Sequence, residues 1–209
     1  MEEKYIRLGL SFQVPPVVSD KAVAMSQELA TKYKAKFVLD AKNFYPHITI
    51  YPPSYPAKNL PKIIANVEKF VKNIDLIQMT YSKIESRHGY VMVYFELSPE
   101  IKILHKNIVE ILNPLREGYI NPKFASIEYA ERLSRQEMEM VSQYAYPYVM
   151  NHYCHPHLSL IRLEDVEEAK NIISNLKWNI KTFMVDKLVL HKIGDNGAAV
   201  EFVKEFDLK

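Results

Sequence analysis

Two short stretches of the sequence repeat the same order of residues that can do chemistry. Residues 46–51 read PHITIY and residues 156–161 read PHLSLI, so in each a histidine follows a proline and a hydroxyl residue stands two positions later. Side chains two positions apart in a β-strand lie on the same face, roughly 7 Å apart along the backbone. Each stretch therefore predicts a strand that presents one imidazole and one hydroxyl to the same side.

These four side chains suit phosphoryl chemistry if the two strands face each other. With a reference pKa near about 6.5, one imidazole of His47 and His157 can accept a proton from a nucleophile while the other donates one to a leaving oxygen. The hydroxyls of Thr49 and Ser159 can donate hydrogen bonds to phosphate oxygens, where charge builds up in the transition state. One His-x-Thr pattern is common by chance, but two copies in the same context favour a catalytic pair. Such a site requires neither a metal nor a cofactor, and we expect neither.

The elements predicted around the two motifs repeat as well. After each motif, apolar periodicity predicts a helix, at residues 60–71 and 164–176, and then two β-rich segments that turn at Gly89 or Gly197. Two similar lobes predict a bilobal α+β fold with a pseudo-two-fold axis. In this fold two antiparallel-rich sheets face a central cleft and the helices lie outside.

We expect residues 1–209 to form a single bilobal domain, with one lobe around residues 40–97 and the other around residues 150–209. Ser134 and Glu137 fit a capping box at the start of a further helix. The other predicted elements are strands at residues 5–12, 45–51, 74–85, 90–97, 155–161, 181–193 and 198–206, and helices from Ser19 or Asp20 to about Lys36, at 99–112 and at 134–144.

Composition excludes several classes of protein. The 209 residues are 48% hydrophobic and 25% charged, which is typical of a globular chain with a sizeable core. A net charge of +2 does not indicate a general nucleic-acid binder, and a single cysteine excludes an internal disulfide framework. No apolar run approaches the roughly 20 residues that cross a bilayer, and the first residues lack the apolar core of a signal peptide. We therefore expect a cytoplasmic monomer without a membrane partner.

Four further residues are expected to contact a substrate. Arg7 lies on the strand face opposite its apolar neighbours, and Arg162 follows the second motif, so either guanidinium can hold a phosphate. Tyr51 and Tyr153 flank the motif strands, where a tyrosine ring can stack on a base. The alternatives are solvation for Arg162 and ordinary packing for the tyrosines.

The second motif also lies in a run of histidines that resembles a metal site. His155 shares a predicted strand face with His157, and His-x-His is a spacing of metal ligands. A metal would require two more ligands, and Cys154 is expected on the opposite face. The pattern therefore favours structural or rim positions for His152 and His155 over a metallohydrolase site.

The other histidines are expected to be structural. His191 alternates with apolar residues, which predicts a packed histidine, with a position facing the cleft as the alternative. His88 is expected in a turn and His105 on the surface of a helix.

The two motifs resemble the hallmark of the 2H phosphoesterase superfamily, which is a pair of His-x-Thr/Ser motifs on symmetric lobes. Residues 6–15, IRLGLSFQVP, resemble the first strand of its 2′-5′ RNA ligase-like branch. Residues 146–160 also resemble the segment before the second motif in the phosphonate-operon branch. In outline the resemblance covers most of the chain.

The resemblance implies metal-independent action on 2′,3′-cyclic phosphates or on 2′-5′-linked nucleotides and RNA. By this resemblance His47 and His157 are the acid–base pair, and Thr49 and Ser159 hold the phosphate. The partner would be a nucleotide or RNA that carries such a group. The alternative is a non-catalytic module that binds a nucleotide or RNA in the same cleft.

Overall fold

The protein is described here by a computed structural model that covers residues 4–40, 42–131, 133–152 and 155–209. Two five-stranded antiparallel sheets form its centre, which confirms the predicted α+β fold. The strands are β1 (Tyr5–Gln13), β2 (Ala35–Val38), β3 (His47–Tyr51), β4 (Ser54–Pro56), β5 (Ile77–Arg87), β6 (Tyr90–Phe95), β7 (His157–Leu163), β8 (Thr182–Val185), β9 (Lys187–Ile193) and β10 (Ala199–Asp207). The helices are α1 (Pro16–Ala30), α2 (Leu60–Val71), α3 (Pro99–Leu112), α4 (Pro122–Ala125), α5 (Ile127–Ala130), α6 (Arg135–Tyr144) and α7 (Val166–Ile172).

Each sheet takes strands from both halves of the chain. The first sheet has the order β10-β9-β1-β3, with β4 also paired to β1, and the second has the order β2-β7-β6-β5-β8. The hairpin β5–β6, which follows the first motif, therefore lies beside the second motif strand, β7. The hairpin β9–β10, which follows the second motif, lies beside β1. Residues 40–97 and residues 150–209, which were expected to form one lobe each, both contribute strands to both sheets.

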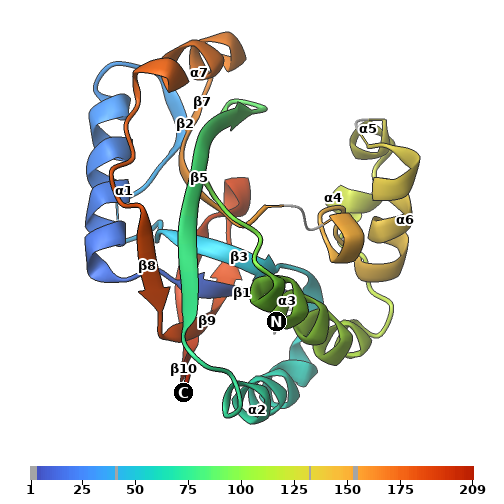
Figure 1. Cartoon of the computed structure of the whole chain (residues 1–209). Helices are drawn as coiled ribbons and strands as arrows, with labels where there is room; N and C mark the ends of the chain where they lie inside the picture. The colour runs from blue at the N-terminus through green and yellow to red at the C-terminus, as the bar shows by residue number, and fades with distance from the viewer. Residues whose placement is uncertain (1–3, 41, 132, 153–154) are drawn as a thin grey trace.

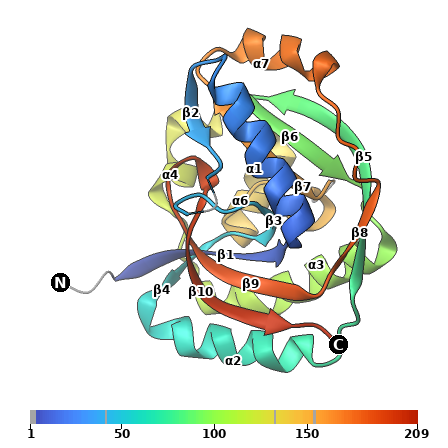
Figure 2. The same ribbon diagram turned by 90° about the vertical axis from the view of Figure 1, so that its left-hand side faces the viewer.

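The helices cover the outer faces of the two sheets (Figures 1 and 2). α1 and α7 pack on the second sheet, whereas α2 contacts β10 and α3 contacts β3 of the first sheet. The strands β3 and β7 contact each other across the space between the sheets. The short helices α4 and α5, together with α6, form a separate group on the side of the molecule away from α1.

Local sequence signals account for several helix boundaries. Ser98 caps the start of α3, because its hydroxyl accepts a hydrogen bond from the backbone N–H of Ile101 over 3.3 Å. The capping box of Ser134 and Glu137 at the start of α6 is confirmed. α2 spans the predicted residues and buries one apolar stripe against the first sheet.

Other boundaries differ from the prediction. α1 begins at Pro16 without a serine or aspartate cap, because a proline suits the first helical position. It ends at Ala30, since residues 35–38 form β2 rather than a helical continuation. Residues 181–193 were expected to form one strand and instead form two, which are separated by Asp186 and belong to different sheets.

His105 was expected on a helix surface, and this prediction is wrong. The side chain is only 1% exposed and connects three elements. Its Nδ1–H donates to the carbonyl of Ile50 in β3 over 3.1 Å, and its Nε2 accepts the backbone N–H of Met150 over 2.9 Å. His88 lies in the β5–β6 turn with a φ of 53°, as predicted.

Among the described residues, no helix combines the length and the apolar character that a membrane span requires.

Candidate functional site

The first motif strand, β3, contains a β-bulge directly after its histidine and hydroxyl. Thr49 lies opposite Ser11 of β1, but the next pair along the strands is Tyr51 with Leu10, so Ile50 is an extra residue. A bulge changes which face the following side chains occupy. The side chains of Ile50 and Tyr51 are consequently both buried.

The second motif strand, β7, has a bulge at the equivalent position. Ser159 lies opposite Met92 of β6, but the next pair is Ile161 with Val91, so Leu160 is the extra residue. In both strands the extra residue is the third one after the histidine. The internal symmetry of the molecule thus extends from the motif residues to the irregularity of the backbone.

The bulge in β7 places Arg162 on the same face as His157. Strict alternation would put these two residues, five positions apart, on opposite faces. After the bulge Arg162 pairs with Tyr90, which shares its face of β6 with Met92. The predicted position of Arg162 beside the motif therefore depends on a feature that alternation alone does not reveal.

The bulge in β3 places Tyr51 on the face opposite to that of His47, although the two residues are four positions apart. The ring is 1% exposed, and its hydroxyl lies 2.9 Å from both the Oδ1 of Asn113 and the carbonyl of Tyr144. A side chain that is buried and bonded in this way holds α3 and α6 to the sheet. This placement does not support the expected contact between Tyr51 and a substrate.

Both motif histidines are oriented by the same backbone contact. The Nδ1–H of His47 donates to the carbonyl of Tyr45 over 2.8 Å, and that of His157 donates to the carbonyl of His155 over 3.3 Å. In each case the acceptor lies two residues earlier, across a proline. Because a carbonyl can only accept, each neutral ring carries its proton on Nδ1 and keeps the lone pair of Nε2 for other chemistry.

The surroundings favour the neutral form of both histidines. Burial lowers the pKa of His47 to about 4; the bond to Tyr45 opposes this effect and the nearby His157 adds to it. Burial also lowers the pKa of His157, the bond to His155 opposes it, and the Arg87 guanidinium lowers the pKa further. The two imidazoles come from β3 and β7, which contact each other, and a charge on His157 lowers the pKa of His47 further.

A third histidine, His191 of β9, packs directly against the first motif. Its ring centroid lies 4.8 Å from that of His47, and the side chain is fully buried. Its Nδ1–H donates to the carbonyl of Lys192 over 3.2 Å, and its Nε2 accepts the hydroxyl of Ser11 over 2.8 Å. Burial, with a contribution from His47, lowers its pKa to about 3. The prediction that His191 is packed is confirmed, and its ring lies beside that of His47.

Sequence reasoning missed the residues that surround the imidazoles. Ser11 and Gly9 come from β1, and a Cβ atom on Gly9 would lie 2.7 Å from Cε1 of His191. Tyr94 of β6 lies opposite His157, with a ring-centroid distance of 5.5 Å. The alternation of β1 places Gly9 and Ser11 on one face, but nothing in the sequence pairs them with a histidine 180 positions away.

The two arginines expected near the site are held by the tip of the β9–β10 hairpin. An Arg7 guanidinium N–H donates to the carbonyl of Gly194 over 3.3 Å, and one from Arg162 donates to Oδ1 of Asn196 over 2.6 Å. The Arg162 guanidinium also lies 4.8 Å from the centre of the Tyr90 ring. One short turn of the first sheet thus contacts an arginine of each sheet.

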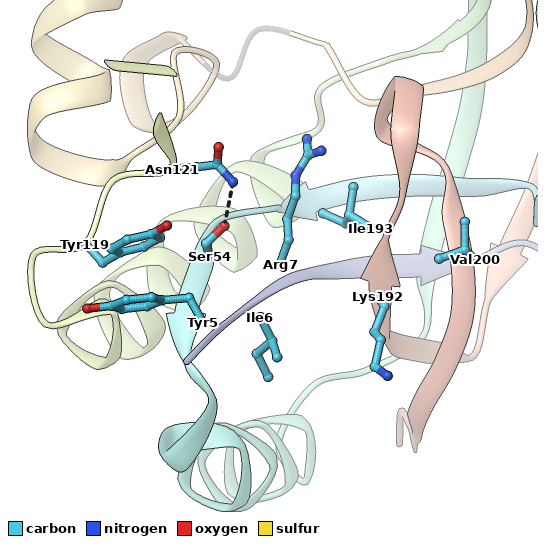
Figure 3. A pocket seen from close by; sticks show the side chains of 9 residues that line it. All are labelled: Tyr5, Ile6, Arg7, Ser54, Tyr119, Asn121, Lys192, Ile193 and Val200. Carbon is cyan, nitrogen blue, oxygen red and sulfur yellow. Dashed lines mark hydrogen bonds between the residues drawn. The ribbon is translucent and has the colours of Figure 1, made fainter. Parts of the chain in front are cut away.

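A cavity of about 310 Å³ lies next to Arg7, at the outer end of β1 (Figure 3). Ser54 and Asn121 line it, and the side-chain amide of Asn121 donates to the hydroxyl of Ser54 over 3.3 Å. Figure 3 shows the Arg7 side chain rising from β1 between Asn121 and Ile193.

The histidine run before β7 is only partly described. Tyr153, expected to contact a substrate, and Cys154 lie outside the described residues. The ring centroid of His155 lies 5.9 Å from that of Tyr94. Within the described part of the chain, no three His, Cys, Asp or Glu side chains come together as metal ligands.

Solved structures of other proteins share this fold. TT0787 of Thermus thermophilus is 12% identical, with a TM-score of 0.59, and the match covers 97% of this chain and 98% of that one. E. coli LigT complexed with 3′-AMP is 12% identical, with a TM-score of 0.55 and 99% of each chain covered. A crystal structure of a phosphoesterase is 12% identical, with a TM-score of 0.52 and coverage of 98% and 99%. These likenesses confirm the 2H phosphoesterase fold that the motifs implied.

The search of curated proteins gives no match to this sequence. A family model described as "Protein of unknown function (DUF1045)" matches residues 49–195, which include Thr49 of the first motif and the whole of the second. Since this match spans more than half of the chain, the chain belongs to the DUF1045 family.

Proposed function

We propose that this protein is a metal-independent phosphodiesterase that opens 2′,3′-cyclic phosphates or cleaves 2′-5′-linked nucleotides or RNA. The observation that carries the proposal is the symmetric pair His47 and His157. Each donates its Nδ1–H to the carbonyl two residues earlier and keeps the lone pair of Nε2. E. coli LigT, which shares the fold, has been crystallised with 3′-AMP and with ATP. A nucleotide is therefore a reasonable class of ligand for this site.

The proposed hydrolysis needs one neutral and one protonated imidazole. For a 2′,3′-cyclic phosphate, the neutral histidine accepts a proton at Nε2 as water attacks phosphorus. The bond between phosphorus and one ribose oxygen breaks, and the protonated histidine donates its Nε2 proton to that oxygen. One proton is taken up and one is given back, and the product is a ring-opened phosphomonoester.

Hydroxyl groups beside the imidazoles would hold the non-bridging phosphate oxygens. Thr49 and Ser159 each lie two positions after a histidine, on the same strand face. Donors in this position stabilise the charge that develops on the phosphoryl oxygens. Arg162 lies on the same face of β7, further along the strand.

Binding of the anionic substrate would favour the protonated imidazole, which takes its proton from solvent. In the free site the surroundings lower the pKa of both histidines. A phosphodiester anion between them favours the charged imidazolium and raises the pKa of the nearer ring. The general acid is then formed in the complex with the substrate rather than in the free protein.

An assay against 2′,3′-cyclic nucleotides, RNA ends with a cyclic phosphate and 2′-5′ dinucleotides tests the proposal. We expect turnover of at least one of these substrates, unchanged by a chelator. His47→Asn and His157→Asn should each reduce kcat by about 10²- to 10⁴-fold, the usual contribution of a general acid or base. A matched control is His155→Asn, which removes a neighbouring imidazole and leaves both motifs intact.

Three results would contradict the proposal. Full activity in the double variant of His47 and His157 would exclude the histidine pair as the acid–base catalysts. Binding of a nucleotide without turnover of any of these phosphodiesters would indicate the non-catalytic module. Stoichiometric zinc in the purified protein, with loss of activity on chelation, would indicate a metallohydrolase centred on residues 152–157.

A further inference from the structure

Three cationic side chains from three different elements converge beside the proposed site. Arg7 comes from β1, Arg162 from β7 and Lys123 from α4. The Arg7 guanidinium lies 5.9 Å from the ring centre of Phe124, the residue after Lys123. Both arginines also contact residues 194–196 of the hairpin tip. The sheets and the α4–α6 group thus bring these cations together.

The charge of this cluster is only partly balanced. Burial lowers the pKa of Lys123, the guanidinium groups of Arg7 and Arg162 lower it further, and Asp195 alone opposes them. Lys123 is thus repelled by both guanidinium groups, and one exposed carboxylate, Asp195, lies beside it. An anion between the cations would relieve this repulsion.

Both arginines also have hydrogen-bonding capacity that the protein does not use. The Nε atoms of Arg7 and of Arg162 are buried and have no hydrogen-bond partner among the described residues. Buried donors are normally satisfied, and a guanidinium fork is well suited to the oxygens of a phosphate. The two unused N–H groups are therefore a second, independent indication of an anionic ligand.

Tyrosines from the α4–α6 segment line the same region and remain neutral. The ring centroids of Tyr129 and Tyr146 lie 5.0 and 5.7 Å from that of Phe124. Burial raises the pKa of Tyr129 to about 12 and also raises the pKa of Tyr146, so neither hydroxyl ionises near neutral pH. Both side chains are partly exposed and can donate hydrogen bonds without adding negative charge.

The cluster lies at a short distance from the motif residues along the strands. Arg162 and Ser159 pair with residues of β6 that are two positions apart, which corresponds to roughly 7 Å. From these placements we infer that Arg7, Lys123 and Arg162 form a second phosphate subsite, which binds a phosphate monoester on the same molecule as the cyclic phosphodiester. This inference rests on the proposed function, since it places the first phosphate between the histidines. The substrate class becomes a sugar or nucleotide with two phosphate groups.

Calorimetric binding of adenosine 3′,5′-bisphosphate and of 3′-AMP tests the second phosphate subsite. We expect the bisphosphate to bind the unmodified protein at least about tenfold more tightly, as expected for one additional charge-assisted contact. Lys123→Gln should reduce this preference to less than about threefold, and Lys123→Arg should retain it. Lys123 is exposed, so neither change disturbs the core. The control is Lys170→Gln, an exposed lysine of α7, which should leave the preference unchanged.

Equal affinities for the two nucleotides would overturn the inference, and so would binding of neither or an unchanged preference in Lys123→Gln. These results are separable from those of the activity assay. A bisphosphate preference without turnover would contradict the proposed catalysis and support the second phosphate subsite. Turnover without a preference for the bisphosphate would contradict the second phosphate subsite and support the proposed catalysis.

Discussion

His191 shows how one neutral side chain can fix the position of another. Its two ring nitrogens are both used, one as a donor to Lys192 and one as an acceptor from Ser11. Burial, with a contribution from His47, keeps the pKa of the ring low, and the neutral ring can accept the Ser11 hydroxyl. His191 therefore gives His47 a rigid, uncharged neighbour.

Gly9→Ala and Ser11→Ala separate the packing of His191 from its hydrogen bond. The new methyl group of Gly9→Ala would lie 2.7 Å from the imidazole, so the ring, which packs against His47, must shift. We expect a loss of about 1–3 kcal/mol in the free energy of unfolding and a loss of about tenfold or more in kcat/KM. Ser11→Ala leaves a buried acceptor unpaired at a similar cost of about 1–3 kcal/mol, with a smaller effect on kcat/KM.

Denaturant unfolding and kinetics on the same preparations measure both effects. Equal kinetic losses in the two variants would contradict a positioning effect of the His191 ring. An unchanged stability of Gly9→Ala would show that the ring can move at no cost.

The pH dependence of catalysis follows from the pKa values of the motif histidines. If His47, with a pKa of about 4, is the base, it is neutral above that pH. The acid, His157, must be protonated, and its pKa is lowered from 6.5, so its protonated fraction falls before pH 6.5 is reached. We expect kcat/KM, which reports the free enzyme, to be highest between pH 4 and 6.5.

Since the bound phosphate raises the pKa of the acid, the alkaline limb of kcat should lie at higher pH than that of kcat/KM. Measuring both profiles on one substrate checks this. A kcat/KM that stays constant from pH 5 to pH 8 would contradict the assignment.

At the residue scale the sequence points to the proposed catalytic histidines but not to their neighbours. His47 and His157 could be found because the same pattern, six residues long, occurs twice in the sequence. His191 and Gly9 meet only through the pairing of β1 with β9, which no local pattern encodes. The burial of Tyr51 and the position of Arg162 on the same face as His157 depend on two bulges that strict alternation does not predict.

At the scale of elements, His105 connects α3, β3 and the segment before β7. It uses both nitrogens as a neutral imidazole, and burial lowers its pKa to about 4. Between pH 6.5 and about 4 the unfolded chain binds a proton at this residue that the folded protein does not. The free energy of unfolding should therefore fall as the pH is lowered through this range.

His105→Gln tests this contribution, which amounts to about 3 kcal/mol at most. The variant should be less stable at pH 7, because its amide cannot reproduce both bonds, but should lose less stability between pH 7 and pH 4. Denaturant unfolding at a series of pH values measures the slope. A slope identical to that of the unmodified protein would show that His105 does not contribute.

Elements with local signals were predicted well, and those that depend on distant pairing were not. α2, α3 and α6 follow from apolar periodicity, and α3 and α6 also follow from caps that lie within a few residues. β8 and β9 separate because one pairs with β5 and the other with β1, partners far away in the sequence. β2 and β4 are short strands that have no alternation of their own.

At the scale of the whole molecule, the exchange of hairpins favours a single cooperative unit. Because each half of the chain supplies strands to both sheets, neither half can complete a sheet alone. We propose on this basis that residues 1–209 form one domain despite the internal symmetry.

Equilibrium unfolding tests this proposal. Circular dichroism follows both sheets, whereas the fluorescence of Trp178, the only tryptophan, reports the segment before β8. The side chain is 6% exposed and so changes environment on unfolding. We expect the two transitions to coincide. Separate midpoints would show that the lobes unfold independently.

The position of β9 between β1 and β10 sets the order in which the first sheet can form. β1 is translated before its partner β9, which follows about 180 residues later, as the bond between Ser11 and His191 illustrates. Until then one hydrogen-bonding edge of β1 lacks its partner strand, and pairings this distant are slow to form. The first sheet, and with it the neighbourhood of His47, can therefore be completed only after β9 has been made, and until then the edge of β1 is open to wrong pairing.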